Sequence, residues 1–455
     1  MKIEITRRRF LELGGATGAA LVMGPMIVNF PPWAAISAEG ATSYVRSFCE
    51  MCTSRCPIEA KVVDNSVVFI NGHPDWKATG GRVCARGGAG FSQMYDPQRL
   101  KKPLIRTGER GEGKWREATW EEAFDLIASK MKELKEKYGP ESMAFACRKG
   151  PHMPFLYNLA KAYGSPNTFN HESTCPIART VALEATFGTA NLGVDYGNVK
   201  YLVTLGRNYF EGIHVAQTRG VMAAMQKGAK LVSVDPRYSI TSAKAKEWLP
   251  IKPSTYLAFV LALNNVLIQE GLYDKEFVAN YTAGFPALAE QIKQYTPQWA
   301  EKECDISASD ISRIARELAA ARPKAVVDWG WRTQSTLEEF ELRRAIVIAN
   351  MLLGNLEVPG GTFFQKNAKF LNAMVGTDIV PALKWPSMPP FPKPARPRID
   401  GIDVKGHANS MVPPVDGVVQ MIPEAILTGD PYPIHGWFVY RYNPALTIPD
   451  TTRVV

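Results

Sequence analysis

The chain has 455 residues, 46% hydrophobic and 21% charged, a composition that is ordinary for a globular protein of two or three domains. Its formal net charge of +9 is scattered, without a basic stripe interleaved with aromatic residues, which argues against nucleic-acid binding. Only seven residues are cysteine, and a chain of this size builds its core without a disulfide framework.

The first 38 residues have the pattern of a twin-arginine export signal. Arginines at positions 7 to 9 precede an apolar stretch of small residues, and residues 34–38 offer a cleavage site. A basic membrane anchor is the alternative, but residues 13–30 include four glycines and a proline, which is weak for a spanning helix. We therefore expect a protein that is exported folded to the periplasm.

Residues 43–105 are expected to form a small β-rich domain that holds a metal cluster. Short β-like runs alternate there with glycine-rich turns. Four cysteines have the spacing C-x2-C-x3-C-x27-C, namely Cys49, Cys52, Cys56 and Cys84. Three thiolates on one loop and a fourth from a later turn suit a [4Fe–4S] cluster. A structural zinc site is the alternative, although such sites usually pair two C-x2-C knuckles.

Arg86 lies two residues after Cys84. A fixed cation there would lower the cost of adding an electron to the cluster, or lie between the cluster and a second cofactor. An ordinary loop arginine explains the residue equally well.

Strands and helices alternate beyond residue 105. Thr119 and Glu122 form a capping box at the start of a helix that continues to about Tyr138. Apolar runs between amphipathic stretches predict buried strands at 143–146, 201–205, 230–234 and 325–328. The alternation predicts a doubly wound parallel α/β sheet, which binds ligands at the carboxyl ends of its strands.

Cys175 lies in a polar loop just before a helix expected over residues 176–187. A thiolate beside a helix N-terminus has a lowered pKa and makes a good metal ligand or nucleophile. An inert thiol in a capping loop is the alternative.

Two consecutive strands end in polar turns that suit a nucleotide. Gly206, Asn208 and Glu211 follow the first strand, and Asp235 and Arg237 follow the next. Backbone amides at such turns bind phosphates, and an acidic side chain recognises a nucleobase or ribose. Neither a G-x-G-x-x-G after a strand nor a P-loop motif is present, so an NAD or ATP site is not supported.

The resulting fold class is α/β, with a small β-rich cluster domain in front of parallel-sheet dinucleotide-binding domains. The proline-rich segment after residue 375 is interpreted as an extended crossover, after which a new strand begins. The expected segments are the signal (1–38), the cluster domain (43–105), an α/β dinucleotide-binding domain (106–375), the crossover (376–433) and the start of a second, incomplete α/β dinucleotide-binding domain (434–455).

The motifs together resemble those of molybdenum–pterin oxidoreductases of the dimethyl sulfoxide reductase type. Within that family they are most similar to the catalytic subunits of thiosulfate or polysulfide reductases. The resemblance extends along the whole chain, and its most specific stretches are residues 49–59, 82–88, 95–103, 164–167, 173–176, 353–357 and 360–361.

This resemblance implies two cofactors, a [4Fe–4S] cluster and molybdenum (or tungsten) held by two pterin guanine dinucleotides. It implies that Cys175 ligates the molybdenum and that Arg86 lies between cluster and pterin. His152 and Arg332 would border the metal. One dinucleotide would be held by Gly206, Asn208, Glu211, Asp235 and Arg237.

The resemblance also implies an activity and partners. A sulfur anion would bind at molybdenum and its S–S bond would be cleaved, releasing sulfide. Electrons would come from a ferredoxin-like, multi-cluster subunit fed by a quinol-oxidising membrane anchor. Arsenate reduction, formate oxidation and a truncated, non-catalytic iron–sulfur protein are the alternatives.

Two departures from the family pattern affect these expectations. The chain has Pro253-Ser-Thr-Tyr256 where the family has Pro-Gly-x-Asp, and a tyrosine does not accept two guanine N–H bonds as a carboxylate does. The chain also stops before the rest of the second dinucleotide domain and the family's C-terminal β-barrel domain. If it is the whole product, we expect it to hold the second dinucleotide poorly.

Overall fold

The computed structural model describes residues 41–52, 54–150, 152–190, 192–211, 214–330, 338–365, 391–401 and 416–454. The export signal expected over residues 1–38 and the candidate residue Arg332 lie outside these ranges. The chain divides into two compact units between Arg99 and Leu100.

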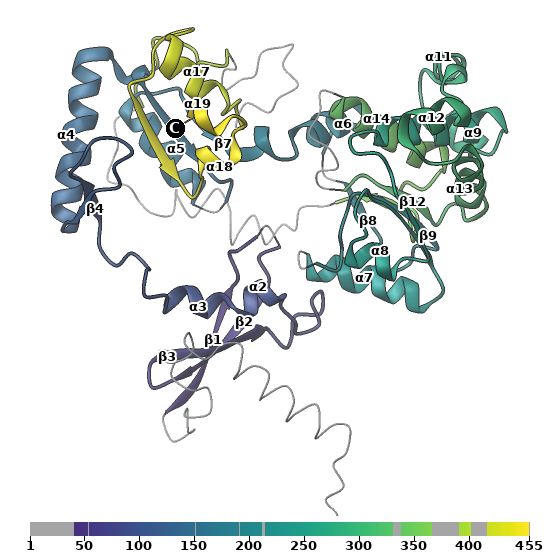
Figure 1. The fold of residues 1–455 in the computed structure, drawn as a ribbon, viewed down its shortest axis with the longest axis horizontal. Coiled ribbons are helices and arrows are strands. Elements are labelled where there is room, and N and C mark those ends of the chain that lie inside the picture. The colour runs from purple at the N-terminus through teal and green to yellow at the C-terminus, as the bar shows by residue number, and fades with distance from the viewer. Residues whose placement is uncertain are drawn as a thin grey trace, which may run out of the picture. The chain divides into compact units, whose positions relative to one another are not determined.

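The N-terminal unit is a three-stranded antiparallel meander, in the order β1-β2-β3, with two short helices (Figure 1). Asp64 and Asn65, both with positive φ, make the tight turn between the second and third strands. A small core forms around Ile58, Ala60 and Ile70. The elements are β1 (Thr42–Phe48), β2 (Pro57–Val63), β3 (Ser66–Gly72), α2 (Ala85–Gly88) and α3 (Gly90–Met94).

The second unit contains a four-stranded parallel sheet in the order β11-β10-β9-β12. Its strands are β9 (Tyr201–Leu205), β10 (Lys230–Val234), β11 (Glu247–Leu249) and β12 (Ala325–Asp328). Successive side chains of a strand face opposite sides. Val203 and Leu205 accordingly enter one core, and Leu202 enters another with Val221 of α7 (Val215–Gln226). Helices cover both faces of this sheet, which confirms the doubly wound α/β fold (Figure 1).

Helix α9 (Tyr256–Gln269) lies at the centre of the larger core. Eleven of its fourteen residues are buried, and a helix that is apolar on most sides belongs in an interior. It contacts α12, α13 and α14, which complete this face. The helices around the sheet are α6 (Ile177–Phe187), α7 (Val215–Gln226), α8 (Ile240–Lys244), α9 (Tyr256–Gln269), α10 (Lys275–Tyr281), α11 (Phe285–Gln291), η3 (Ile292–Gln294), α12 (Pro297–Cys304), α13 (Ala308–Ala320) and α14 (Glu339–Leu352).

A second parallel sheet has the order β14-β6-β7 and joins distant parts of the chain. Its strands are β6 (Met143–Cys147), β7 (Thr168–Asn170) and β14 (Gly436–Tyr440). Ala144 and Ala146 pack toward Ile422 of α17 (Met421–Thr428), whereas Phe145 faces α5 (Met153–Tyr163). This arrangement differs from the expectation for residues 376–455. Part of the expected crossover is helical, and the expected first strand of a new domain instead completes the sheet of β6, because both edges of β6 need a hydrogen-bonding partner.

The remaining elements surround these sheets. Thr119 accepts a hydrogen bond from the backbone N–H of Glu122 at 3.1 Å, which confirms the predicted helix start. None of the helices described here combines the length and the apolar character that crossing a bilayer requires. The elements are β4 (Leu104–Arg106), β5 (Trp115–Glu117), α4 (Trp120–Tyr138), η1 (Pro140–Ser142), η2 (His171–Thr174), β8 (Leu192–Val194), β13 (Thr362–Phe364), α18 (Pro444–Thr447) and α19 (Thr451–Val454).

Candidate functional site

The four cysteines of the N-terminal unit converge at one end of its meander. Cys49 follows β1 and Cys56 precedes β2, and the Cys49 N–H donates to the Cys56 carbonyl at 2.9 Å, which closes the loop between them. Cys84 is the residue before α2. Burial, and then the neighbouring thiols of Cys52, Cys49 and Cys84, raise the pKa of the Cys56 thiol. The four sulfurs are therefore close enough to influence one another.

The backbone of α2 packs closely beside these thiols. A Cβ on Gly87 would lie 2.3 Å from Val83 Cγ2 and 3.4 Å from Cys49 Sγ, so glycine lets the helix approach Cys49 without displacing the Val83 side chain. In the described residues, no three His, Cys, Asp or Glu side chains are grouped to hold a single metal ion. Four thiols on a loop and a helix start are the donor set of a [4Fe–4S] cluster, and the residues fit that group. Arg86 is exposed on α2, two residues beyond Cys84.

Cys175 lies at the junction of β7, the turn η2 and helix α6. The Asn170 side chain accepts from the Glu172 N–H at 2.9 Å and so caps the turn, and the Cys175 N–H donates to the Glu172 carbonyl at 2.9 Å. Helix α6 starts at Ile177, one residue later than expected, with Pro176 before it. The partly buried thiol therefore lies beside a helix N-terminus, as the sequence predicted.

Charged residues surround this turn at the carboxyl edge of the β14-β6-β7 sheet. The Lys149 ammonium lies 3.1 Å from an Asp416 carboxylate oxygen, and the Lys149 backbone N–H donates to His171 Nδ1 at 3.2 Å. Burial raises the pKa of Glu172, and the charge of Lys149 opposes that rise. His152 is exposed just before α5, with its ring edge-on to Tyr440 at 6.2 Å between centroids.

Sequence reasoning missed Lys149 and Asp416. Lys149 could have been found, because it follows a predicted buried strand and the carboxyl ends of parallel strands meet at one edge. Asp416 carried no signal, because it lies in a proline-rich segment hundreds of residues from the turn that it contacts.

The five residues expected to hold a dinucleotide come together at the carboxyl ends of β9 and β10. Gly206 has a φ of 60°, and its N–H donates to the Val234 carbonyl at 2.9 Å. Arg237 donates to both Glu211 carboxylate oxygens, at 2.8 and 3.3 Å. Thr241 donates to the Asn208 side-chain oxygen at 2.7 Å.

The two carboxylates of this group differ in environment. The hydrogen bonds from Arg237 are the main cause that lowers the pKa of Glu211 to about 2. Burial raises the pKa of Asp235, whose carboxylate accepts the Arg237 backbone N–H at 2.9 Å. Tyr256 is 3% exposed, and Ser254 has a φ of 66° at the position where the family has glycine. The Tyr256 side chain is therefore part of the core. This agrees with the expectation that Tyr256 does not bind guanine as an aspartate at this position would.

A buried acceptor on Gln420, which contacts the turn before Cys175, also suits a pterin. Gln420 donates through Nε2 to the Ser173 carbonyl at 3.0 Å, while its Oε1 is buried without a hydrogen-bond partner among the described residues. A pterin has several N–H donors, and a leftover acceptor on a side chain that contacts this turn fits such a group.

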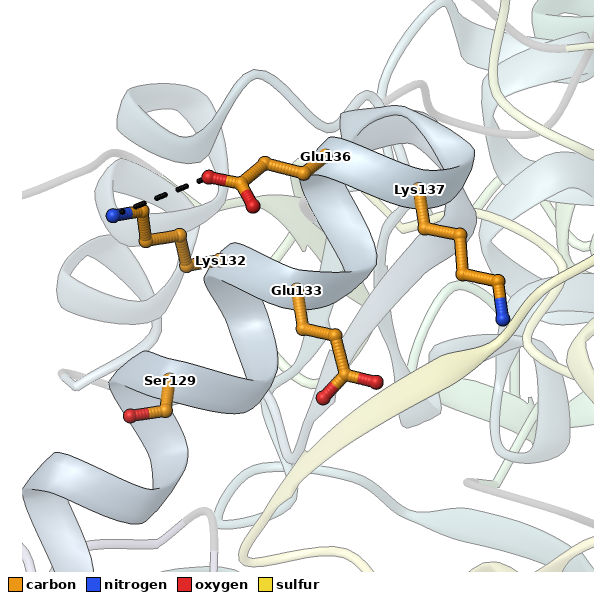
Figure 2. A pocket seen from close by; sticks show the side chains of 5 residues that line it. All are labelled: Ser129, Lys132, Glu133, Glu136 and Lys137. Atoms are coloured by element: carbon orange, nitrogen blue, oxygen red, sulfur yellow. Dashed lines mark ion pairs between the residues drawn. The ribbon is translucent and has the colours of Figure 1, made fainter.

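A separate hollow lies along α4 and includes none of the candidate residues. Figure 2 shows its lining, Ser129, Lys132, Glu133, Glu136 and Lys137, on successive turns of one helix. Lys132 and Glu136 form an ion pair at 4.0 Å. Lysines and glutamates in this alternation are typical of a solvated helix face.

Comparison with known proteins decides the family. The family model "Molybdopterin oxidoreductase" matches residues 99–455, and the model of the molybdopterin oxidoreductase Fe4S4 domain matches residues 42–96. The chain belongs to the molybdopterin oxidoreductase family. This confirms the predicted family, and it confirms the [4Fe–4S] cluster and the molybdenum–molybdopterin as its cofactors.

Several individual molybdopterin oxidoreductases are similar to this chain. The chain is 44% identical over 451 residues to the thiosulfate reductase molybdopterin-containing subunit PhsA of Salmonella typhimurium, covering 98% of this chain and 58% of PhsA. It is 31% identical to the dimethyl sulfoxide reductase DmsA of Haemophilus influenzae, covering 85% of this chain and 54% of DmsA. Acetylene hydratase from Pelobacter acetylenicus has the same fold, with a TM-score of 0.72 at 21% identity over 90% of this chain and 58% of that structure. The chain thus spans between half and three-fifths of the length of these proteins.

Proposed function

We propose that this chain is the catalytic part of a periplasmic reductase of thiosulfate or polysulfide. The observation that carries the proposal is the 44% identity to PhsA across 98% of the chain, against 31% for the dimethyl sulfoxide reductase and for an arsenate respiratory reductase subunit of Chrysiogenes arsenatis. Reduction of thiosulfate consumes two electrons and two protons, breaks the S–S bond and releases sulfide and sulfite, each singly protonated.

The residues of this chain would serve the reaction by holding the cofactor and attracting the anion. Cys175 would hold molybdenum through its thiolate, and the turns containing Gly206 and Asp235 would hold one dinucleotide. When bound, molybdenum exchanges two electrons with the substrate and the cluster passes them singly. The Lys149 side chain is 43% exposed at the edge that presents Cys175, and His152 is exposed there too. The Lys149 ammonium at this edge would favour a sulfur dianion over a neutral substrate.

Partners and location complete the proposal. PhsA is described as a subunit, which supports a ferredoxin-like electron-transfer subunit and a quinol-oxidising membrane anchor as partners. The twin-arginine pattern of residues 1–38 supports export to the periplasm.

Replacing Arg7 and Arg8 by lysine should therefore retain the protein in the cytoplasm. Fractionation of the cells would measure how much of the protein reaches the periplasm.

The decisive test is the metal content and substrate range of the full chain, produced anaerobically with its cofactor machinery. We expect about one molybdenum and about four irons per chain, with oxidation of a reduced dye by thiosulfate or polysulfide. If protein that contains both molybdenum and iron reduces only arsenate or dimethyl sulfoxide, or only oxidises formate, the proposed substrate is wrong. Iron without molybdenum would overturn the enzymatic proposal and leave a cluster-binding protein.

A further inference from the structure

Residues 416–420 make several hydrogen bonds to the turn that presents Cys175, although they lie more than 240 residues away in the sequence. The Asn170 N–H donates to the Asp416 carbonyl at 3.0 Å, and the Asn170 side-chain amide donates to the Asp416 carboxylate at 2.8 Å. The Val419 N–H donates to Ser173 Oγ at 3.1 Å, and Gln420 donates to the Ser173 carbonyl at 3.0 Å. The residue before the turn η2 and the third residue of that turn are therefore held by one segment.

Asp416 is the centre of these contacts. Its side chain is 3% exposed, and the same carboxylate oxygen accepts from Asn170 and from the Lys149 ammonium. Lys149 also contacts the turn directly, through its backbone N–H to His171. A buried carboxylate with two donors is strongly held in place, because removing either donor leaves charge unpaired in the interior.

The contacts reach Cys175 through Asn170. The Asn170 side chain uses its N–H for Asp416 and its oxygen for the Glu172 N–H, and the Glu172 carbonyl in turn accepts the Cys175 N–H. Each group in this chain of hydrogen bonds has one orientation that satisfies both neighbours. The position of Asp416 therefore fixes the backbone of Cys175.

We propose that Asp416 and Lys149 are positioning residues that hold the Cys175 thiolate in its metal-binding orientation. The hold on the turn stands on these contacts alone, and only its consequence for catalysis rests on the proposed function. Because these residues act through the turn, their replacement should lower the molybdenum content per chain and the turnover rate of the molybdenum-containing enzyme. The iron content of the N-terminal unit should not change.

Lys149 offers the cleaner pair of variants, because its side chain is partly exposed and its replacement leaves the core intact. Lys149→Met removes the ammonium and Lys149→Arg keeps a cation within reach of Asp416. In full chain produced without molybdenum, we expect the Glu172 and Cys175 amides to exchange with deuterium roughly tenfold faster in Lys149→Met. Alkylation of Cys175 by iodoacetamide, followed peptide by peptide, should accelerate with it, and Lys149→Arg should restore both rates.

Asp416→Asn extends the test and has a matched control. Glu141 is also buried, in η1 just before the opposite end of β6, where its carboxylate accepts the Ala395 N–H at 2.7 Å. Glu141→Gln makes the same carboxylate-to-amide change without touching the turn. We expect Asp416→Asn, unlike Glu141→Gln, to raise the rates of amide exchange and of alkylation at Cys175. It should also lower the molybdenum content per chain several-fold while the iron content is unchanged. Finally, it should lower kcat by a larger factor than the factor by which KM changes.

The possible results separate the two proposals. Unchanged exchange and alkylation at Cys175 in both Lys149→Met and Asp416→Asn would overturn the positioning role, whatever the activity. Faster alkylation in these variants with no sulfur reductase activity in the parent would overturn the proposed function and leave the positioning role standing. Should Asp416→Asn fail to fold, the two Lys149 variants still decide the question.

Discussion

The seven cysteines of this chain differ in environment, and the difference assigns their roles. Burial raises the pKa of the Cys147 thiol to about 12, and burial also raises that of Cys304. An isolated thiol held neutral inside a core is inert toward metals. Cys56 is buried as well, but unlike Cys147 and Cys304 it lies among three neighbouring thiols, those of the partly buried Cys49, Cys52 and Cys84. Their grouping, rather than burial alone, marks the cluster ligands.

Replacing Cys49 by serine should remove most of the cluster. Serine lacks the soft thiolate that holds iron, so we expect iron to fall from about four per chain to well under half of that, together with the visible charge-transfer absorption. Cys304→Ala is the control, because this buried thiol at the end of α12 packs in the core. The Cys304→Ala variant should keep its iron and lose about 1 kcal/mol in the free energy of unfolding. Equal iron loss in both variants would contradict the assignment.

Asn350 closes the free edge of β12. Its side-chain oxygen accepts the Val327 N–H at 3.2 Å and its amide donates to the Val327 carbonyl at 2.8 Å, so one side chain replaces the neighbouring strand that an edge lacks. Asn355 donates to the same oxygen at 2.8 Å.

Asn350→Leu should therefore be costly although the residue is remote from every candidate ligand. It leaves a buried N–H and a buried carbonyl without partners, and we expect a loss of about 3 kcal/mol in the free energy of unfolding. Urea denaturation measures the free energy of unfolding. The control is Asn198→Ala, a substitution at an exposed residue, which should cost under about 1 kcal/mol of that free energy. A loss no larger than that of the control would show that the edge of β12 is satisfied by other groups.

At the scale of elements, an ion-pair network joins α13 to the strands of the larger sheet. Glu317 of α13 accepts from Lys230 of β10 at 2.6 Å and from Tyr201 of β9 at 2.7 Å, and Arg313 lies 3.1 Å away. Burial alone would raise the pKa of Glu317, but hydrogen bonds from Lys230, Tyr201 and Arg313 outweigh it and lower the pKa to about 2.

This shift predicts how stability depends on pH. A carboxylate with a lowered folded-state pKa contributes in full above its unfolded pKa, near 4.5, and the contribution disappears as the pH falls toward 2. Glu317→Gln should thus be less stable than the parent at pH 7, and the difference in urea midpoint should shrink steadily below about pH 5. Glu303→Gln, on the exposed side of α12, should show no such trend. A difference that stays constant down to pH 3 would refute the assignment.

The elements also show what the sequence was able to predict. Strands β9, β10 and β12 were predicted with the observed bounds, because a buried parallel strand is a continuous apolar run that ends in polar or glycine-rich turns. The cysteine cluster and the strand-end residues followed from spacing in the same way. The partner of β6 did not, since it is β14, almost 300 residues later. Asp416 was missed for the same reason, because a side chain that acts across such a separation leaves no local pattern.

At the scale of the whole second unit, two of its cores differ in origin. The larger core draws on residues between Leu183 and Leu356, so it is built from one continuous part of the chain. The core beside β6 combines Ala144, Ala146 and Phe169 with Ile399, Val419 and Ile434. Its formation must wait for the C-terminal residues, because contacts of high sequence separation require closing a long loop first.

A chain that ends at residue 365 should therefore lose one core and keep the other. Without β14 and α17, β6 has an open edge and an uncovered face, so its amides should exchange with deuterium orders of magnitude faster than in the full chain. The amides of β9 should stay protected to within roughly tenfold, because the sheet, α9 and α13 all remain. A chain ending at Tyr440 is the control, since it keeps β14 paired with β6 and lacks only α18 and α19. Hydrogen exchange followed by mass spectrometry resolves peptides from both strands in a single experiment. If β6 remains protected in the shorter chain, the C-terminal residues do not complete its core.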